Sequence, residues 1–162
     1  MPQITTAQSQ HASKISQLFW AITQEQDYLR SNTPNKTEVA RRITIEGAHF
    51  EVITTDTDKV LGFLHAIPAD KSDISRRFSS SPNCMWISWL MVAKECRGTG
   101  MAQELMDRFI KACNPDVTPS AEAMVATEND RSLRFFKRNQ FTTNYRFGST
   151  TVLHQTHQMR VL

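Results

Sequence analysis

Apolar residues recur at helical spacing near the start of the chain. Ile15, Leu18, Phe19 and Ile22 follow the i, i+3, i+4, i+7 pattern by which one face of a helix meets a hydrophobic core. This stripe predicts a helix near residues 8 to 23.

Three further segments are predicted to be helical. Asn35, followed three residues later by Glu38, resembles a capping box and predicts the start of a short helix. Gly47 is the expected stop of this helix. Residues 101–113 present a broad apolar face. Residues 128–139 carry acids at the start and basic side chains toward the end, which complements the helix macrodipole.

The remaining apolar segments are typical of strands. The first two are β-branched and joined by a polar turn, which predicts an antiparallel hairpin, and the last two form a closing hairpin around Gly148. Residues 84–93 are the most apolar and are expected to be buried on both faces, whereas the polar residues 69–83 read as a surface loop. The predicted strands are residues 49–54, 59–67, 84–93, 120–126, 141–147 and 150 onward.

This order of elements predicts an α/β or α+β sheet domain. With 162 residues, 40% of them hydrophobic and 22% charged, the chain is expected to form a single domain over residues 1–162. The net charge of +3 is spread along the chain without a basic run, which argues against a nucleic-acid partner. No apolar run approaches membrane-spanning length, and no secretory signal is recognisable, so no membrane association is expected.

The cysteines point to a reducing compartment. Cys84, Cys96 and Cys113 are odd in number and widely spaced, with no C-x-x-C pair. Neither a disulfide framework nor a metal site is therefore expected, and a cytoplasmic location fits best.

The stretch from Arg97 to Ala102 carries the candidate chemistry. It contains Gly98 and Gly100 and lies between the most apolar strand and the broad-faced helix. A strand that leads through a glycine turn into a helix presents unpaired backbone N–H groups to a phosphate or diphosphate. The spacing excludes a P-loop, and the third glycine of the dinucleotide-binding pattern would fall at Gln103. A plain glycine turn and another kind of nucleotide-binding site stay open.

The segment around this turn resembles the acyl-CoA signature of the GNAT N-acetyltransferases. Arg97, Gly100 and Ala102 match its core pattern, R/Q-x-x-G-x-G/A, and an L-x-V strand that begins at Leu90 precedes them. Gly62 lies in a segment that resembles the third strand of the family.

A second family segment, N-x-x-A-x-x-L/F-Y-x-x-x-G-F, is also similar to part of the chain. Asn129, Phe135 and Phe141 match it, and Ser132 stands in its small-residue position. Gln140 replaces the usual glycine before Phe141.

The resemblance implies a GNAT-like fold with acetyl-CoA as cofactor. The sheet would be mixed and mostly antiparallel, would splay between its fourth and fifth strands, and would be flanked by about four helices. Pantetheine would pair with backbone groups of the fourth strand, the pyrophosphate would lie on the amides of residues 97–102, and Asn129 would contact the pantetheine arm. The expected cofactor-binding residues are Leu90, Val92, Arg97, Gly98, Thr99, Gly100, Met101, Ala102, Asn129 and Phe136.

The chain departs from the family at its catalytic positions. Phe136 stands where many members have a tyrosine acid, and neither Trp86 nor Ser88 can ionise where a strand carboxylate often assists deprotonation of the amine. We therefore name His65, Ser88 and Glu122 as candidate catalytic residues. The alternatives are that His65 is a hydrogen-bonded core residue and that Ser88 packs inside the sheet.

The predicted activity is transfer of an acetyl group from acetyl-CoA to a primary amine of a small molecule or peptide by direct attack. The alternative is a catalytically weak GNAT domain that binds acyl-CoA as a sensor or structural ligand. A homodimer is left open.

In this family, the first two helices, their connecting loop and the last hairpin build the acceptor pocket. Here these segments offer the aromatic or imidazole side chains of Trp20, Tyr28, Phe147 and His154. Of these, Trp20 is expected to pack in the core.

Overall fold

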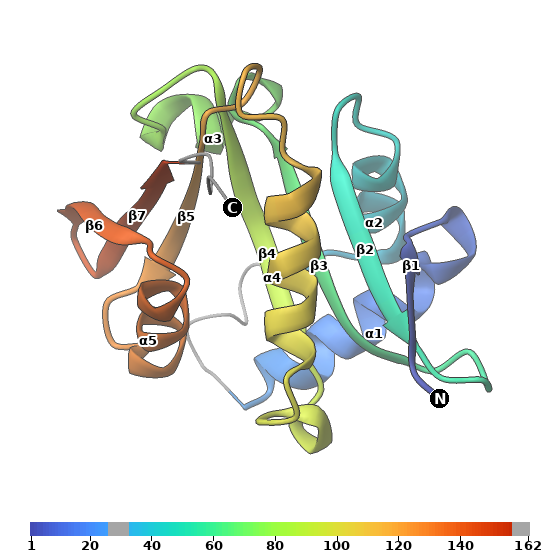
Figure 1. Cartoon of the computed structure of the whole chain (residues 1–162). Coiled ribbons are helices and arrows are strands. Elements are labelled where there is room, and N and C mark those ends of the chain that lie inside the picture. Colours follow the sequence, from blue (N-terminus) through green and yellow to red (C-terminus); the bar gives the residue numbers. More distant parts are fainter. Residues whose placement is uncertain (26–32, 157–162) are drawn as a thin grey trace. The chain divides into compact units, whose positions relative to one another are not determined.

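The computed structural model describes residues 1–25 and 33–156, and Figure 1 labels their helices and strands. The helices are α1 (Ala12–Thr23), α2 (Lys36–Ile43), α3 (Asp73–Phe78), α4 (Met101–Ala112) and α5 (Asp130–Arg138). The strands are β1 (Gln3–Thr6), β2 (His49–Thr54), β3 (Val60–Pro68), β4 (Cys84–Val92), β5 (Ser120–Ala126), β6 (Thr142–Phe147) and β7 (Thr150–Thr156).

The seven strands form one sheet in the order β1-β2-β3-β4-β5-β7-β6. Strands β4 and β5 are parallel, whereas β1–β2, β2–β3, β5–β7 and β6–β7 are antiparallel pairs. The parallel pairing runs from Cys84↔Ser120 to Ile87↔Ala123, and β4 continues beyond it to Val92. The predicted mixed, mostly antiparallel sheet is therefore confirmed, whereas the splay between the fourth and fifth strands stays a prediction.

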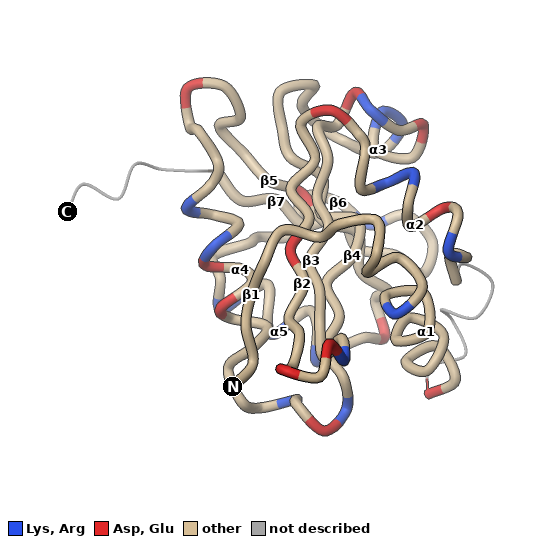
Figure 2. Tube along the Cα trace, turned by 90° about the vertical axis from the view of Figure 1, so that its right-hand side faces the viewer, with Lys and Arg blue, Asp and Glu red and all other residues tan. Residues whose placement is uncertain are grey.

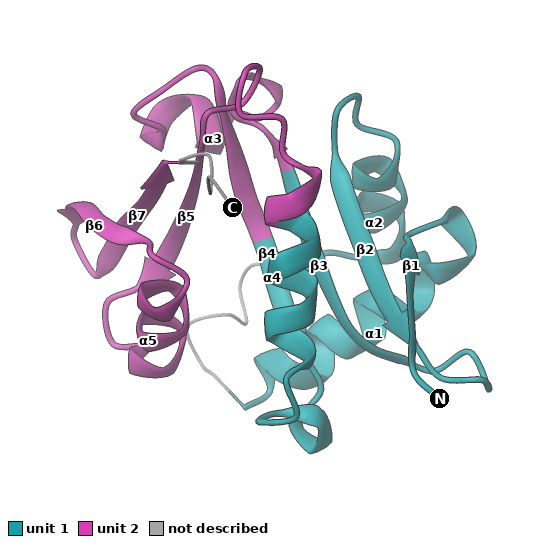
Figure 3. Ribbon diagram, in the orientation of Figure 1, with its two compact units in different colours: residues 1–66, 89–109 teal, residues 67–88, 110–162 magenta. Residues whose placement is uncertain are grey.

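The chain divides into two compact units, coloured separately in Figure 3. The first unit contains residues 1–66 and 89–109, and the second contains residues 67–88 and 110–162. The chain passes from one unit to the other within β3, within β4 and within α4. The single domain over residues 1–162 stays a prediction.

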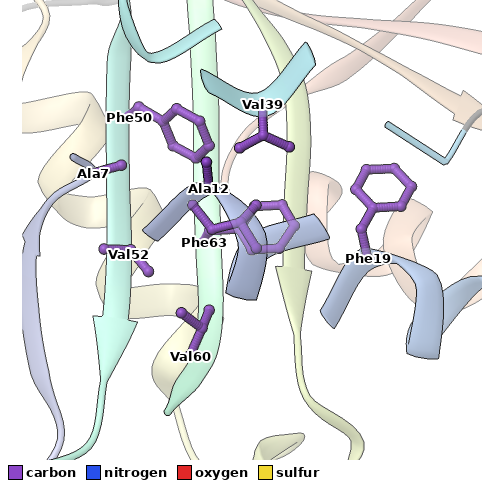
Figure 4. Packing of buried hydrophobic residues seen from close by; sticks show 9 residues of the cluster. Ala7, Ala12, Phe19, Val39, Phe50, Val52, Val60 and Phe63 are labelled. Carbon is purple, nitrogen blue, oxygen red and sulfur yellow. The ribbon is translucent and has the colours of Figure 1, made fainter. Parts of the chain in front are cut away.

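The first unit is built on the helical stripe expected near residues 8 to 23. Ile15 and Phe19 are buried at 0% and 2% exposure, and Phe19 stacks on Phe63 with ring centroids 6.2 Å apart. Figure 4 shows Ala12 and Phe19 of α1 together with labelled side chains of β2 and β3 from the same cluster. Burial of each large apolar side chain contributes about 1.5–3 kcal/mol. The cluster consists of Ala7, Ala12, Ile15, Phe19, Val39, Phe50, Val52, Val60 and Phe63.

Helix α2 begins where the local sequence predicted, but it ends at Ile43, four residues before the expected stop at Gly47. The Asn35 side chain accepts a hydrogen bond of 2.8 Å from the Glu38 N–H, which caps the helix. Gly47 follows the helix with φ +76°, a left-handed conformation that glycine adopts without steric cost. The Glu38 carboxylate bonds Arg41 and Arg42, and these bonds lower its pKa to about 2.

The second unit holds β5, β6 and β7 with helices α3 and α5. Helix α5 ends in a Schellman motif, because the Gln140 N–H donates to Lys137 O and the Phe141 N–H to Phe136 O, both at 3.0 Å. The Phe136 and Phe141 rings meet at 5.0 Å across this motif, and both are buried. Gln140 takes φ +67°, which explains why glycine is the usual residue here.

The structure differs from the expected elements in three places. Residues 69–83 are not only a loop, because they contain α3, whose polar composition hid it and whose first turn is capped by Ser72 accepting from the Ser75 N–H. The described part of the chain contains five α-helices, close to the expected number of about four. Strand β1 was not predicted because four residues at a sheet edge leave little apolar pattern. Strand β4 is buried only over Cys84–Ile87, and residues 88–92 are half-buried.

Acidic and basic positions are interspersed along the chain trace, as Figure 2 shows for α3 and for the α4 side. On α3, Asp73 lies 3.9 Å from Arg76 one turn later. Near the surface of the first unit, Lys59 pairs with Glu95 at 2.8 Å. Exposed pairs of this kind stabilise a fold by at most about 1 kcal/mol each, so they contribute little to the architecture.

Candidate functional site

The glycine turn lies in the first unit, between β4 and α4. Gly98 and Gly100 have φ values of +81° and +91°, which L side chains rarely adopt. A Cβ atom built on either glycine meets no atom within 4 Å. The turn is therefore open, and a ligand can approach its backbone closely.

Few backbone amides of this turn are used by the protein itself. The Thr99 N–H donates to Cys96 O at 3.4 Å, and the first helical bond of α4 runs from the Glu104 N–H to Gly100 O at 3.0 Å. Within the described residues, no backbone acceptor is found for the amides of Gly100, Met101 and Ala102. These N–H groups lie at the positive end of a 12-residue helix, and this arrangement binds phosphate groups.

The end of β4 presents its backbone in a fixed direction. Met91 O lies 2.9 Å from the position of a Cβ on Gly62, and the Ala93 N–H donates to Leu61 O at 2.8 Å, so both residues turn their polar groups toward β3. Because successive residues of a strand alternate, the backbone groups of Leu90 and Val92 point away from β3. Extended pantetheine could add to this side of the strand.

Arg97 joins the strand to the glycine turn. Its Nη1 donates to Glu25 Oε2 at 2.7 Å, and its Nε lies 3.4 Å from Val92 O. The Arg97 and Glu25 side chains are 20% and 33% exposed. Glu25 follows α1 and is 72 residues away in sequence, so no local pattern could have indicated it.

His65 lies in the core of the first unit. It is fully buried, its ring packs against Phe50 at 4.7 Å and Trp89 at 5.1 Å, and neither ring nitrogen makes a hydrogen bond in the described part of the chain. Burial, aided by the charge of Arg42, lowers its pKa from 6.5 to about 3. A buried imidazole of such low basicity suits packing rather than proton transfer.

Glu122 lies in the second unit and is fully buried on β5. Its carboxylate accepts from the Ser80 N–H at 3.2 and 3.1 Å and from the Ser80 hydroxyl. His154, directly opposite on β7, places Nδ1 at 3.2 Å from Glu122 Oε1. These partners offset the cost of burying the charge. Ser80 was not predicted, since a serine in a polar loop gives no signal of such a contact.

The Glu122–His154 pair resembles the way a carboxylate orients an imidazole that exchanges protons. If Nδ1 donates to Glu122, Nε2 is left as the acceptor, and it lies 3.3 Å from Thr156 Oγ1. The His154 side chain is 29% exposed, so solvent or a substrate can reach the ring.

The other predicted residues lie on β4 and on α5 or its cap, and they differ in burial and in hydrogen bonding. Ser88 is half-buried on β4, and Trp86, at 3% exposure, lies opposite Glu122 in the parallel pairing. Asn129 caps α5 by accepting from the Ser132 N–H at 3.1 Å, which leaves its amide NH2 as a donor. Phe136 is 5% exposed and packs in the core of the second unit.

Three of the four acceptor-pocket residues lie in the described part of the chain, and Tyr28 lies outside it. Trp20 is 59% exposed, so the expectation that it packs in the core was wrong, because its neighbour Phe19 occupies the inward face of α1. Phe147 is 61% exposed and contacts Phe78 at a centroid distance of 5.6 Å.

The described residues contain no group of side chains arranged to hold a metal ion and no helix that could cross a membrane. All three cysteines are free. Burial raises the pKa of the Cys84 and Cys113 thiols to about 11, which keeps them protonated and unreactive at neutral pH.

Comparison with known proteins bears directly on the glycine turn. The sequence model described as the acetyltransferase (GNAT) family matches residues 13–141. A search of curated proteins finds no match.

Solved structures are similar in fold over nearly the whole chain. A GNAT-family acetyltransferase from Staphylococcus aureus Mu50 has a TM-score of 0.79 at 12% identity, covering 98% of this chain and 100% of its own. The PaiA N-acetyltransferase of Thermoplasma acidophilum in complex with coenzyme A has a TM-score of 0.76 at 14% identity, covering 96% and 99%. The YncA protein of Salmonella typhimurium, solved with its cofactor acetyl-CoA, has a TM-score of 0.76 at 15% identity, covering 100% and 97%.

Proposed function

Because the chain belongs to the GNAT acetyltransferase family, we propose that it transfers the acetyl group of acetyl-CoA to a primary amine of a small molecule or peptide. The observation that carries this proposal is the open glycine turn from Arg97 to Ala102. Its positive-φ glycines leave the backbone open, and its free amides at the start of α4 can donate to a diphosphate.

The strand that leads into the turn supports the same cosubstrate. Leu90 and Val92 point their backbone groups away from β3, so an extended pantetheine amide chain could bond to them while the diphosphate lies on the turn. Acetyl-CoA supplies the activated acetyl thioester. Two solved structures of similar fold contain coenzyme A or acetyl-CoA.

The proposed reaction is a direct displacement at the thioester. The neutral amine nitrogen attacks the carbonyl carbon, the C–S bond breaks, and the sulfur leaves with the bonding electron pair and then takes up a proton. A thiol with a pKa of ~8.5 leaves as the thiolate at a cost of only roughly 2 kcal/mol at neutral pH. The absence of a hydroxyl at Phe136 is therefore compatible with turnover.

The proton lost by the amine needs an acceptor. Of the three predicted catalytic residues, Glu122 is the one with an ionisable and accessible partner, so we assign proton acceptance to His154 and positioning of its imidazole to Glu122. The other buried carboxylate–imidazole contact, His49 with Glu51 at 3.5 Å, is less suited because Arg108 already pairs with Glu51 at 2.8 Å. Amines with a pKa of ~8 need less deprotonation than lysine-type amines at ~10.4, and we expect them to react faster.

The test is incubation of the full chain with acetyl-CoA and a panel of α-amino, aryl-alkyl and lysine-type amines, with release of free thiol as the readout. Gly100→Trp is the matched control, because a large side chain in the open turn blocks the diphosphate. We expect turnover for at least one amine that the control lacks. Equal thiol release by both proteins for every amine would contradict the proposal.

A second function is favoured by the unreactive side chains at the family's catalytic positions. Phe136 and Trp86 are both buried, at 5% and 3% exposure, and neither can ionise. A domain of this kind could bind acyl-CoA as a sensor or structural ligand. Tight calorimetric binding of acetyl-CoA without turnover across the amine panel would favour it, whereas robust turnover would exclude it.

A further inference from the structure

The ion pair between Arg97 and Glu25 connects the glycine turn with the end of α1. Arg97 Nη1 donates to Glu25 Oε2 at 2.7 Å. The Arg97 side chain is half-buried at 20% exposure, and the Glu25 side chain is 33% exposed. The pair is therefore less screened by salt than the fully exposed pairs of this unit.

Arg97 is placed to serve an anion bound at the turn. It directly precedes Gly98, and its Nε also lies near Val92 O at 3.4 Å, so the guanidinium stays beside the start of the turn. A guanidinium bonds phosphate oxygens strongly, in the same two-point geometry with which it bonds a carboxylate. A diphosphate on the turn and the Glu25 carboxylate would therefore compete for the same N–H donors of the Arg97 guanidinium.

Glu25 is held at an electrostatically unfavourable position. It follows the C-terminal end of α1, where its own N–H donates to Ile22 O at 3.0 Å and where the last turn contains no basic residue. A carboxylate beside the negative end of a helix dipole is destabilising. The positive charge of Arg97 offsets this unfavourable interaction. When a stronger anion binds Arg97, the ion pair that holds Glu25 in place is lost.

We propose that Glu25 is an internal competitor of the cofactor diphosphate for Arg97. This inference rests on the proposed function. Binding of acetyl-CoA exchanges the Glu25 carboxylate for phosphate oxygens at Arg97 and frees the last turn of α1. The exchange lowers the apparent affinity for the cofactor and makes the end of α1, beside the exposed Trp20, responsive to it.

The test is calorimetric titration of coenzyme A into the full chain, Glu25→Gln and Glu95→Gln. Glu95→Gln is the matched control. It also removes one negative charge, two residues from Arg97, but the native Glu95 carboxylate pairs with Lys59 and not with Arg97. We expect Glu25→Gln to bind about two- to five-fold more tightly than the parent, as for a partly exposed ion pair. Glu95→Gln should change the affinity less, and the gain should vanish in the Arg97→Gln background.

A second readout follows the helix rather than the ligand. Coenzyme A should accelerate amide hydrogen exchange in the Ile22–Glu25 turn of the parent, whereas a purely structural ion pair would leave it unchanged or slow it. The gain in affinity should persist with 3′-dephospho-coenzyme A, and its loss would assign the competition to the 3′-phosphate and overturn the diphosphate assignment.

The outcomes separate the two proposals. Unchanged or weaker binding by Glu25→Gln, with normal binding by the parent, would overturn the competition alone and identify Glu25 as a brace for Arg97. No binding of coenzyme A by the parent or any variant would overturn the proposed function and the competition together.

Discussion

Replacing Gln140 by glycine should stabilise the protein, although glycine is usually a destabilising choice. Gln140 is the residue that follows the C-cap of α5, and it takes φ +67°. Its side chain is exposed, and no hydrogen bond of that side chain is found in the described part of the chain. The substitution therefore removes backbone strain without removing a contact.

The magnitude follows from two opposing effects. An L residue in the left-handed region costs roughly 1–2 kcal/mol, because its Cβ approaches the following carbonyl oxygen. Glycine also raises the conformational entropy of the unfolded chain. This effect lowers the free energy of unfolding by roughly 0.4–1 kcal/mol and offsets part of the gain. The net expectation for Gln140→Gly is a free energy of unfolding about 0.5–1 kcal/mol higher than that of the parent.

The assay is urea unfolding followed by circular dichroism, with the midpoint compared at an unchanged slope. Gln24→Gly is the matched control, because the same substitution is made at a helix C-cap with φ −67°. The control should lower the free energy of unfolding by up to about 1 kcal/mol. A midpoint for Gln140→Gly equal to or below that of the parent would refute the strain argument, as would equal shifts in both variants.

Four other expectations concern core positions and the Glu122–His154 pair. Gly62→Ala should lower the free energy of unfolding by about 1–3 kcal/mol, since its Cβ would lie 2.9 Å from Met91 O; a melt indistinguishable from the parent would show that β3 and β4 can separate there. Phe136→Tyr should cost about 1–3 kcal/mol by burying a hydroxyl, and thiol release shows whether it also speeds the reaction; no stability loss would mean that the hydroxyl finds a partner. His65 has a folded pKa of about 3 against 6.5, so its neutral form stabilises the fold above pH 6.5 and this stability is lost as the pH falls toward 3, by at most about 1.4 kcal/mol per unit. His65→Leu should lose less stability than the parent between pH 7 and pH 5 in urea titrations, and parallel losses would contradict the assignment. Glu122→Gln and His154→Gln should each lower kcat by about 10²-fold or more, and the double variant should be little worse because the two act as a unit; additive losses in thiol release would separate them.

Local patterns determined most of the secondary structure. The helical stripe that includes Phe19, the Asn35 cap and the glycine turn are interactions among residues close in sequence, whose geometry depends on spacing and on backbone sterics. The same short range explains why α3 and β1 were missed. Each has few residues, and neither has an apolar repeat long enough to stand out.

The surroundings of the functional side chains were decided by the tertiary structure alone. Glu25 reaches Arg97 across 72 residues, and Ser80 reaches Glu122 across 42. Burial converts His65 from a plausible base into a neutral core residue. Such outcomes depend on which distant segments pack together, because desolvation and ion pairing are set by neighbours in space, whereas the chain by itself specifies only neighbours along the backbone.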